Sequence, residues 1–97
     1  MIPALKVEII VEAVSQPKII ALLDKLQING YSIIKDVTGR GTHGTCDAEE
    51  ISDIFKNIYI IVICTQEQST PLLEGMRPLI KKYGGIVFTS TVSVLKK

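Results

Sequence analysis

The sequence predicts an α+β fold in which two β-α-β units build one four-stranded antiparallel sheet with both helices on the same face. Three observations lead to this prediction. Strand-like apolar runs alternate with segments of helical periodicity, the order strand–helix–strand occurs twice within 97 residues, and glycines separate each helix from the strand that follows. Because a β-α-β crossover is right-handed, two such units interleave most simply as a single antiparallel sheet.

The first unit begins with residues 5–11, a run rich in β-branched side chains that is typical of a strand with one well-covered face. Ser15 is placed to cap the following helix, Pro17 is tolerated in its first turn, and Gly30 follows its end. Residues 31–37 then read as the second strand. The helix between them carries an apolar stripe at i, i+3, i+4 and i+7 spacing, made by Ile19, Leu22, Leu23 and Leu26.

The second unit begins with residues 58–64, an apolar run continuous enough for a central strand that is covered on both faces. Ser69 or Thr70 is placed to cap the next helix, with Pro71 at its first position. Pro78 removes one intrahelical donor, so we expect it to kink this helix or divide it into two pieces. One face of the helix is apolar, with Leu72, Met76, Ile80 and Tyr83.

The glycine pair Gly84 and Gly85 is expected to end this helix. Residues 86–90 form the fourth strand, and residues 91–95 either continue it or form a short fifth strand. The resulting order is that of the ferredoxin-like βαββαβ sandwich. This fold by itself does not define a function, because unrelated activities are built on it.

Composition fits a single domain over residues 1–97, and it excludes several classes of protein. The hydrophobic fraction of 46% argues against disorder of the whole chain. Eleven Lys and Arg residues balance ten Asp and Glu residues for a net charge of +1, whereas proteins that neutralise phosphates are far more basic. The central strand also lacks the stacking aromatic residues of RNA-binding sheets. We therefore expect no nucleic-acid partner.

Cysteine and histidine content argues against a metal site and against a secreted disulfide framework. The chain has two cysteines and one histidine, whereas a structural zinc site takes about four such ligands. Cys64 ends an apolar run and is expected to be a small buried residue. The N-terminal residues do not resemble a signal peptide, and the apolar runs are too short to cross a bilayer. We therefore expect a cytoplasmic protein without direct membrane insertion.

A polar, glycine-rich segment at residues 38–57 joins the two units, and it is too long for a plain hairpin connection. Its first part alternates three glycines with a cation, hydroxyl groups and an imidazole. Glycines let a ligand approach backbone N–H groups, while Arg40 adds a fork of donors and Thr42 adds a hydroxyl. The pattern favours a phosphate or carboxylate clamp. A flexible turn with exposed polar residues explains it as well, so both interpretations stay open.

The rest of this segment is acidic, with spaced apolar residues. It reads as a solvated loop or short exposed helix, or as an arm that becomes ordered on a partner. Catalysis by His43 is not expected, because no nucleophile stands in a recognisable frame with it. Tyr59 and Tyr83 are expected to pack in the core or an interface. The acidic residues are Asp47, Glu49, Glu50 and Asp53, and the apolar ones are Ile51, Ile54 and Phe55.

Residues 30–41, Gly-Tyr-Ser-Ile-Ile-Lys-Asp-Val-Thr-Gly-Arg-Gly, resemble the second strand and loop entrance of PII signalling proteins. In that family the strand runs into Gly-x-Gly at the base of a long T-loop. The resemblance is closest to the SbtB-type PII-like regulators of bicarbonate uptake and their carboxysome-associated relatives. Those proteins show Gly-Lys-Gly-Ser-Arg where this chain has Gly-Arg-Gly-Thr-His at 39–43. They show Tyr-Ala-Gly-Ile-Ile-Tyr where it has Tyr-Gly-Gly-Ile-Val-Phe at 83–88.

The resemblance implies a homotrimeric signalling protein that is not an enzyme. It implies that AMP, ADP, ATP or cyclic AMP binds in clefts between neighbouring subunits, with no further cofactor. The T-loop, residues 38–57, would then regulate a partner such as a bicarbonate or other membrane transporter, which would be the protein's only link to the membrane. Carried over by position, the phosphate side is Gly39, Arg40, Gly41, Thr42 and His43. The nucleoside is flanked by Gly85, Ile86, Val87 and Phe88, with Ile33 and Ile34 beneath.

Departures from the family pattern narrow the expected ligand. The glycine- and lysine-rich B-loop of nitrogen-type PII proteins is missing, as is their T-loop modification frame, which argues against joint sensing of ATP and 2-oxoglutarate. His43 replaces a basic residue and is a weaker, pH-dependent donor, which favours a monophosphate-like or other ligand over a tightly bound triphosphate. An ACT-type or CutA-like binding module remains an alternative. An acylphosphatase does not, because residues 12–16 offer no arginine.

Overall fold

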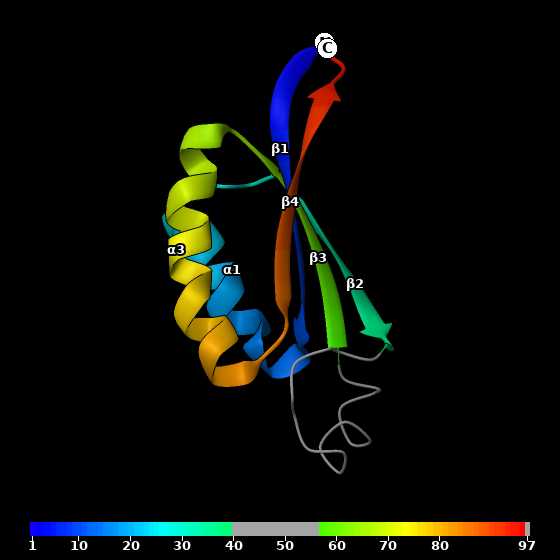
Figure 1. The fold of residues 1–97 in the computed structure, drawn as a ribbon, viewed down its shortest axis with the longest axis vertical. Coiled ribbons are helices and arrows are strands. Elements are labelled where there is room, and N and C mark those ends of the chain that lie inside the picture. Colours follow the sequence, from blue (N-terminus) through cyan, green and yellow to red (C-terminus); the bar gives the residue numbers. More distant parts are fainter. Residues whose placement is uncertain (40–56, 97) are drawn as a thin grey trace.

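The computed structural model describes residues 1–39 and 57–96. The first half contains β1 (Ile2–Glu12), a short 3-10 helix η1 (Ala13–Ser15), α1 (Gln16–Lys25) and β2 (Tyr31–Val37). The second half contains β3 (Asn57–Cys64), α3 (Gln66–Tyr83) and β4 (Ile86–Val94). The predicted order of two β-α-β units is therefore confirmed (Figure 1).

The four strands form one sheet in the order β2-β3-β1-β4, and every neighbouring pair is antiparallel. Both helices lie on one face of this sheet, and the other face has no covering layer among the described elements (Figure 1). This is the predicted ferredoxin-like βαββαβ sandwich. The two central strands, β1 and β3, are the two that begin the β-α-β units.

The core lies between the helices and the helical face of the sheet. Alternate residues of β1 and β3 point into it, as the two-residue period of a strand requires. The predicted stripe of α1 is confirmed at Ile19 and Leu23, which are fully buried, while Leu22 and Leu26 pack at its margin. Besides Ile19 and Leu23, the most buried core side chains are Val7, Ile9, Val11, Ile28, Ile58, Ile60, Val62, Leu72 and Met76.

Gly75 brings the two helices together. A Cβ at this position would lie 2.7 Å from both Cδ atoms of Leu22, closer than side chains tolerate. Because α3 presents bare backbone there, Leu22 of α1 packs directly against it. In the described residues, neither helix has the length and apolar character required to cross a bilayer.

The start of α3 differs from the prediction. Thr65, rather than Ser69 or Thr70, caps this helix. Its Oγ1 accepts a hydrogen bond from the backbone N–H of Gln68 at 3.1 Å, and Gln68 Oε1 accepts one from the backbone N–H of Thr65 at 3.1 Å. This reciprocal capping box satisfies two N–H groups that a cap at Ser69 would leave unpaired.

The expected division of α3 at Pro78 is also wrong, because Gln66–Tyr83 is a single helix of 18 residues with Pro71 and Pro78 inside it. Both prolines are exposed. Each removes only one backbone donor, and on an exposed face the carbonyl that loses its partner can bond to water. The helix end at Tyr83 and the following glycine pair agree with the prediction.

Strands β1 and β4 are longer than the expected runs. β4 continues to Val94 as one strand, so there is no separate fifth strand at this end of the described chain. β1 begins at Ile2, and its first three residues pair with β4 alone, because pairing with β3 starts at Leu5 opposite Cys64. The two strands therefore extend beyond the sheet as a ribbon that ends at both termini (Figure 1).

Ser15 stands at the predicted N-cap of α1 but makes no capping hydrogen bond. Its backbone already has helical angles, φ −78° and ψ −13°, because η1 precedes it, whereas an effective cap has an extended backbone. The side chain is 1% exposed, and its Oγ meets no hydrogen-bond partner in the described part of the chain.

Replacing Ser15 and Thr65, the residues at the N-terminal ends of α1 and α3, should therefore change the free energy of unfolding in opposite directions. Ser15→Ala removes an unsatisfied buried hydroxyl and is expected to raise the free energy of unfolding by about 1 kcal/mol. Thr65→Ala breaks a working cap and is expected to lower it by about 1 kcal/mol. Urea unfolding of both variants checks this, and a loss of stability in Ser15→Ala equal to that in Thr65→Ala contradicts it.

Candidate functional site

The face of the sheet opposite the helices, called here the open face, is largely apolar. Strand register places Ile86, Ile10, Tyr59 and Ile34 in one row across all four strands of this face. Large side chains on it are exposed to an unusual degree: Ile34 by 48%, Ile63 by 39%, Ile86 by 51% and Phe88 by 41%. Exposed large apolar side chains gathered on one face mark a place where another molecule binds.

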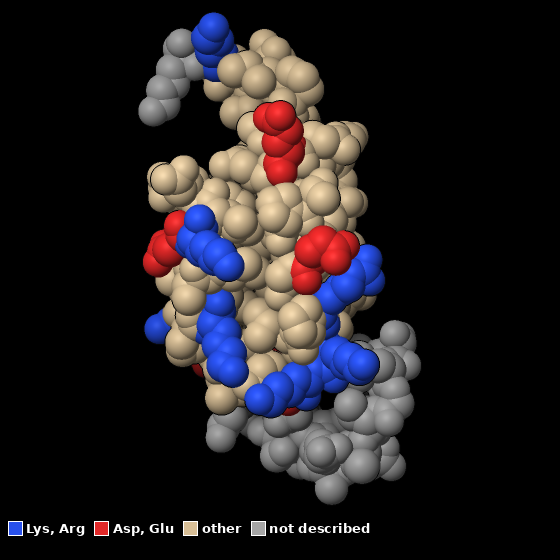
Figure 2. Space-filling model, turned by 90° about the vertical axis from the view of Figure 1, so that its left-hand side faces the viewer, with Lys and Arg blue, Asp and Glu red and all other residues tan. Residues whose placement is uncertain are grey.

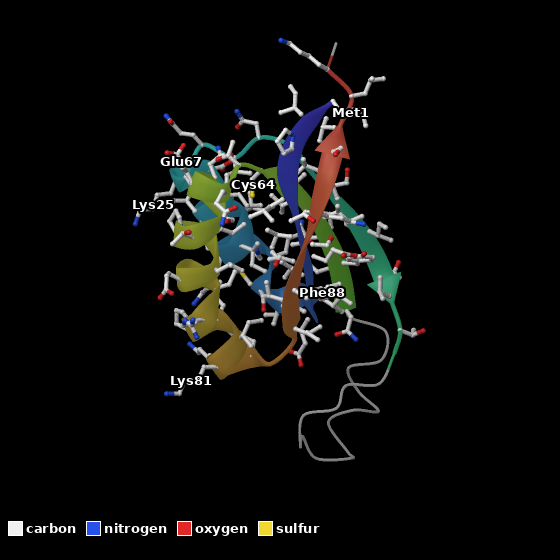
Figure 3. All side chains as sticks on the ribbon, turned by 45° about the horizontal axis from the view of Figure 1, so that its top comes forward. Met1, Lys25, Cys64, Glu67, Lys81 and Phe88 are labelled. Atoms are coloured by element: carbon white, nitrogen blue, oxygen red, sulfur yellow. The ribbon has the colours of Figure 1, made fainter. Side chains whose placement is uncertain are left out.

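β4 shows the preference of this face most clearly. The strand register places Ile86, Phe88 (labelled in Figure 3), Ser90, Val92 and Val94 on the open face, and Val87, Thr89, Thr91 and Ser93 on the side toward the helices. Both threonines are exposed. Because a strand directs its apolar residues toward the side that is buried in the working molecule, the pattern of β4 indicates that the open face becomes covered.

The predicted nucleoside-side residues divide between two edges of the sheet. Ile86 and Ile34 face the same way, but β1 and β3 lie between their strands, so three inter-strand spacings, or about 14 Å, separate them. Ile33 and Val87 point to the helical side and pack against the core. Within one chain, the structure therefore does not gather these residues into one pocket.

The predicted phosphate-side residues lie at the end of β2. Gly39 follows this strand, is exposed, and a Cβ there would meet nothing within 4 Å. The other four, Arg40, Gly41, Thr42 and His43, lie outside the described residues. β2 itself carries a bulge between Ile34 and Val37, in which Asp36 has φ +60°. A bulge of this kind bends a strand and changes the direction in which its end points.

The glycine pair before β4 is required by the fold. Gly84 has φ +80° and its N–H bonds to the Ile80 carbonyl at 2.8 Å, which closes α3. Gly85 has φ +106°, and a Cβ there would lie 2.6 Å from the Ile10 carbonyl oxygen and 2.7 Å from Val11 Cγ1. The expected end of the helix is confirmed. The absence of a side chain at Gly85 lets the start of β4 pack tightly against β1.

Sequence reasoning missed a polar cluster at the centre of the open face. The Tyr59 hydroxyl donates a short hydrogen bond to Glu8 Oε1, and Lys6 Nζ lies 3.8 Å from the same oxygen. The Glu8 side chain is only 13% exposed. Its hydrogen bond raises the pKa of Tyr59 above the ordinary value. The sequence feature that could have indicated this cluster is Glu8, an acidic residue two positions after Lys6 inside an otherwise apolar strand.

Tyr83 forms a second arrangement that sequence reasoning missed. Lys18 Nζ, from α1, lies 5.6 Å from the centre of its ring, and Lys82 Nζ lies 5.3 Å from it. A hydrogen bond with Lys18 lowers the pKa of Tyr83, and the positive charges of both lysines add to this. Lys81 and Lys82 lie in the last turn of α3, and Lys and Arg side chains gather over this part of the helical layer (Figure 2).

Cys64 is buried at the end of β3, as expected from its position in an apolar run. Burial raises the pKa of its thiol, which therefore stays protonated and unreactive near neutral pH.

Alanine substitutions at Gly85 and Gly39 should distinguish a glycine that the fold requires from one that it does not. Gly85→Ala places a Cβ against the Ile10 carbonyl at a left-handed φ, and it is expected to lower the free energy of unfolding by at least about 2 kcal/mol. Gly39→Ala meets open space and is the matched control, with stability close to that of the wild type. Equal stability of the two variants in urea unfolding contradicts this assignment.

The two perturbed tyrosines should ionise in a defined order. Tyr83 is expected to lose its proton first, because Lys18 and Lys82 favour the phenolate. Tyr59 follows at higher pH, because its hydrogen bond to Glu8 favours the neutral phenol. The contribution of the Tyr59 bond to stability is therefore present below pH 10 and is lost as the pH rises through the raised pKa. A pH titration of phenolate absorbance in Tyr83→Phe and Tyr59→Phe checks this order, and Tyr83→Phe should lose the ionisation step at lower pH. Loss of that step in Tyr59→Phe instead would contradict the assignment.

The family model described as nitrogen regulatory protein P-II matches residues 4–97. No curated protein matches the chain. Among solved structures, the chain is similar to CPII from Thiomonas intermedia K12, a nitrogen regulatory PII-like protein bound to ADP, AMP and bicarbonate. The two share 32% identity, with 98% of this chain and 96% of that chain covered and a TM-score of 0.82.

A second CPII structure, bound to ADP and bicarbonate, is 34% identical, covers 95% of this chain and 88% of that chain, and has a TM-score of 0.79. A putative PII-like signalling protein from Thermus thermophilus shares the fold at 21% identity. Its alignment covers 97% of this chain and 91% of that chain, with a TM-score of 0.76.

These comparisons confirm the predicted superfamily and decide against the ACT-type and CutA-like alternatives. The finer resemblance to SbtB-type regulators stays a prediction. With the family model spanning nearly the whole chain and the strand order of the fold in agreement, this chain belongs to the P-II family of nitrogen regulatory proteins.

Proposed function

We propose that this protein is a PII-like signalling regulator, not an enzyme, that binds an adenine nucleotide in clefts between the subunits of a homotrimer. One observation supports this most: the described residues leave the open face uncovered and largely apolar, with the candidate residues Ile34 and Ile86 at its two opposite edges. A single chain presents two half-sites. A second copy packed on the open face supplies the surface that a cleft requires.

Cyclic assembly suits this geometry. When copies associate head to tail around a closed ring, one edge of each copy meets the opposite edge of the next. The β4 edge, with Ile86 and Phe88, then lies beside the β2 edge of a neighbour, with Ile34 and Gly39. The apolar side chains of the open face lose their contact with water in the same step, which drives the assembly.

An adenine nucleotide fits the chemistry of the two half-sites. Arg40 supplies a bidentate fork for a phosphate, and the glycines beside it leave backbone N–H groups accessible. The apolar surface around Ile86 and Phe88 suits a base or ribose, with Gly85 holding that strand in place. Two of the solved CPII structures contain ADP and bicarbonate, one of them with AMP as well, which supports a nucleotide ligand here and makes bicarbonate a second anion to test.

The T-loop, residues 38–57, is proposed as the output of the sensor. Ligand binding at its base changes the relative population of its conformations, and thereby its fit to a partner protein. A bicarbonate transporter or another membrane transporter is the proposed partner. On this proposal the protein works in the cytoplasm and reaches the membrane only through the transporter.

Calorimetric titration with AMP, cyclic AMP, ADP and ATP, each with and without bicarbonate, tests the ligand. Arg40→Ala is expected to weaken binding of the preferred nucleotide by roughly tenfold or more, because it removes charged hydrogen bonds to phosphate. Arg77→Ala, on the exposed surface of α3, is the matched control and should bind like the wild type. The proposal is wrong in its ligand if no nucleotide binds at millimolar concentration.

A further inference from the structure

The centre of the open face holds one ammonium and one carboxylate in an apolar surround. Lys6 and Glu8 are two residues apart on the central strand β1, so their side chains share this face. The register places the apolar Phe88 and Ile61 on either side of Glu8, and it places the apolar Ile63 on one side of Lys6 with Ser90 on the other. When the open face is covered, these apolar neighbours exclude water from the pair.

Glu8 is only partly satisfied within its own chain. Both the Tyr59 hydroxyl and the Lys6 ammonium reach the same atom, Oε1. Among the described residues, no hydrogen bond or ion pair to Oε2 accompanies them. Burial of a carboxylate oxygen without a donor is strongly unfavourable, so a surface that covers this face must bring a donor to it.

Lys6 is suited to supply that donor to a neighbouring copy. Its ammonium has three donors, its distance of 3.8 Å to Glu8 is long for an ion pair, and its side chain is still 34% exposed. Tyr59 already fixes the orientation of Glu8. The Lys6 side chain therefore keeps the freedom to bridge two carboxylates, one in its own chain and one in the next.

Resting on the homotrimer of the proposed function, we infer that Lys6 of each copy pairs with Glu8 of the next copy. The result is a closed ring of alternating charges that specifies how the open faces assemble. Each chain contributes one positive and one negative charge, so the ring is neutral. The apolar side chains around the pair favour association but do not specify how the copies are oriented. The ring specifies one relative orientation and one number of copies, because any other arrangement buries an unpaired charge.

Charge-reversal variants distinguish a ring between copies from an ion pair confined to one chain. Lys6→Glu alone and Glu8→Lys alone place like charges both within and between copies, and each is expected to weaken assembly by about thirtyfold or more. The double variant with both reversals restores the alternation and should assemble like the wild type. Light scattering over a concentration series measures the assembly, and circular dichroism verifies that each variant is folded.

Mixing the two single variants is the decisive arm. In each of them the pair within the chain stays like-charged, but every contact between unlike chains is opposite in charge, and two of the three contacts in a mixed trimer join unlike chains. We expect the mixture to assemble where neither variant does alone. The matched control reverses the exposed Glu74–Arg77 pair of α3, which lies in the helical layer at 3.5 Å, and should leave assembly unchanged.

Two outcomes overturn the inference. If the mixture stays unassembled while the double variant assembles, the pair acts within one chain only. If the single variants assemble like the wild type, the ring has no role. Failure of the proposed function looks different, since it is a failure of the wild type to bind nucleotide or to form an oligomer at all.

Discussion

The structure depends on a sheet that the described residues cover on one side only. Right-handed crossovers place α1 and α3 on the same face, and the core between them and β1 and β3 is complete. The opposite face exposes several large apolar side chains, and β4 contributes Ile86 and Phe88 to it, whereas Val87 packs toward the helices. The helical face of the sheet is therefore buried by the chain itself, whereas burial of the opposite face requires another molecule. The exposed apolar surface favours that association.

Two of the four described residues with a positive φ lie where the two half-sites begin, and a third, Gln27, lies between α1 and β2. Gly85 takes a left-handed φ against the Ile10 carbonyl at the start of β4, and Asp36 takes one in the bulge near the end of β2. Both positions are at the end of the sheet that leads to the long loop. Strained backbone at such places persists only where the surrounding structure enforces it, and it often accompanies a binding function. Here it shapes the two edges that we propose neighbouring copies bring together.

Local patterns in the sequence were sufficient for the fold but not for the open face. The stripe that contains Ile19 and Leu23 and the apolar run of β3 determine the element order, because each depends on residues close together in the chain. The cap at Thr65 was missed because Ser69 and Thr70, which lie inside α3, are hydroxyl residues as well, and only geometry selects among the three. The bond from Tyr59 to Glu8 joins residues 51 positions apart, so it follows from strand register and not from any local pattern. The resemblance located candidate residues at both edges, but it did not show that β1 and β3 separate them.

Native mass spectrometry of the wild-type protein with ADP tests the central claim most directly, because one spectrum reports both the number of chains and the number of nucleotides they carry. The account predicts a species of three chains that binds up to three nucleotides, with no nucleotide on single chains. A single chain that carries ADP as fully as any oligomer would contradict it, since the cleft would then be complete without a neighbouring copy.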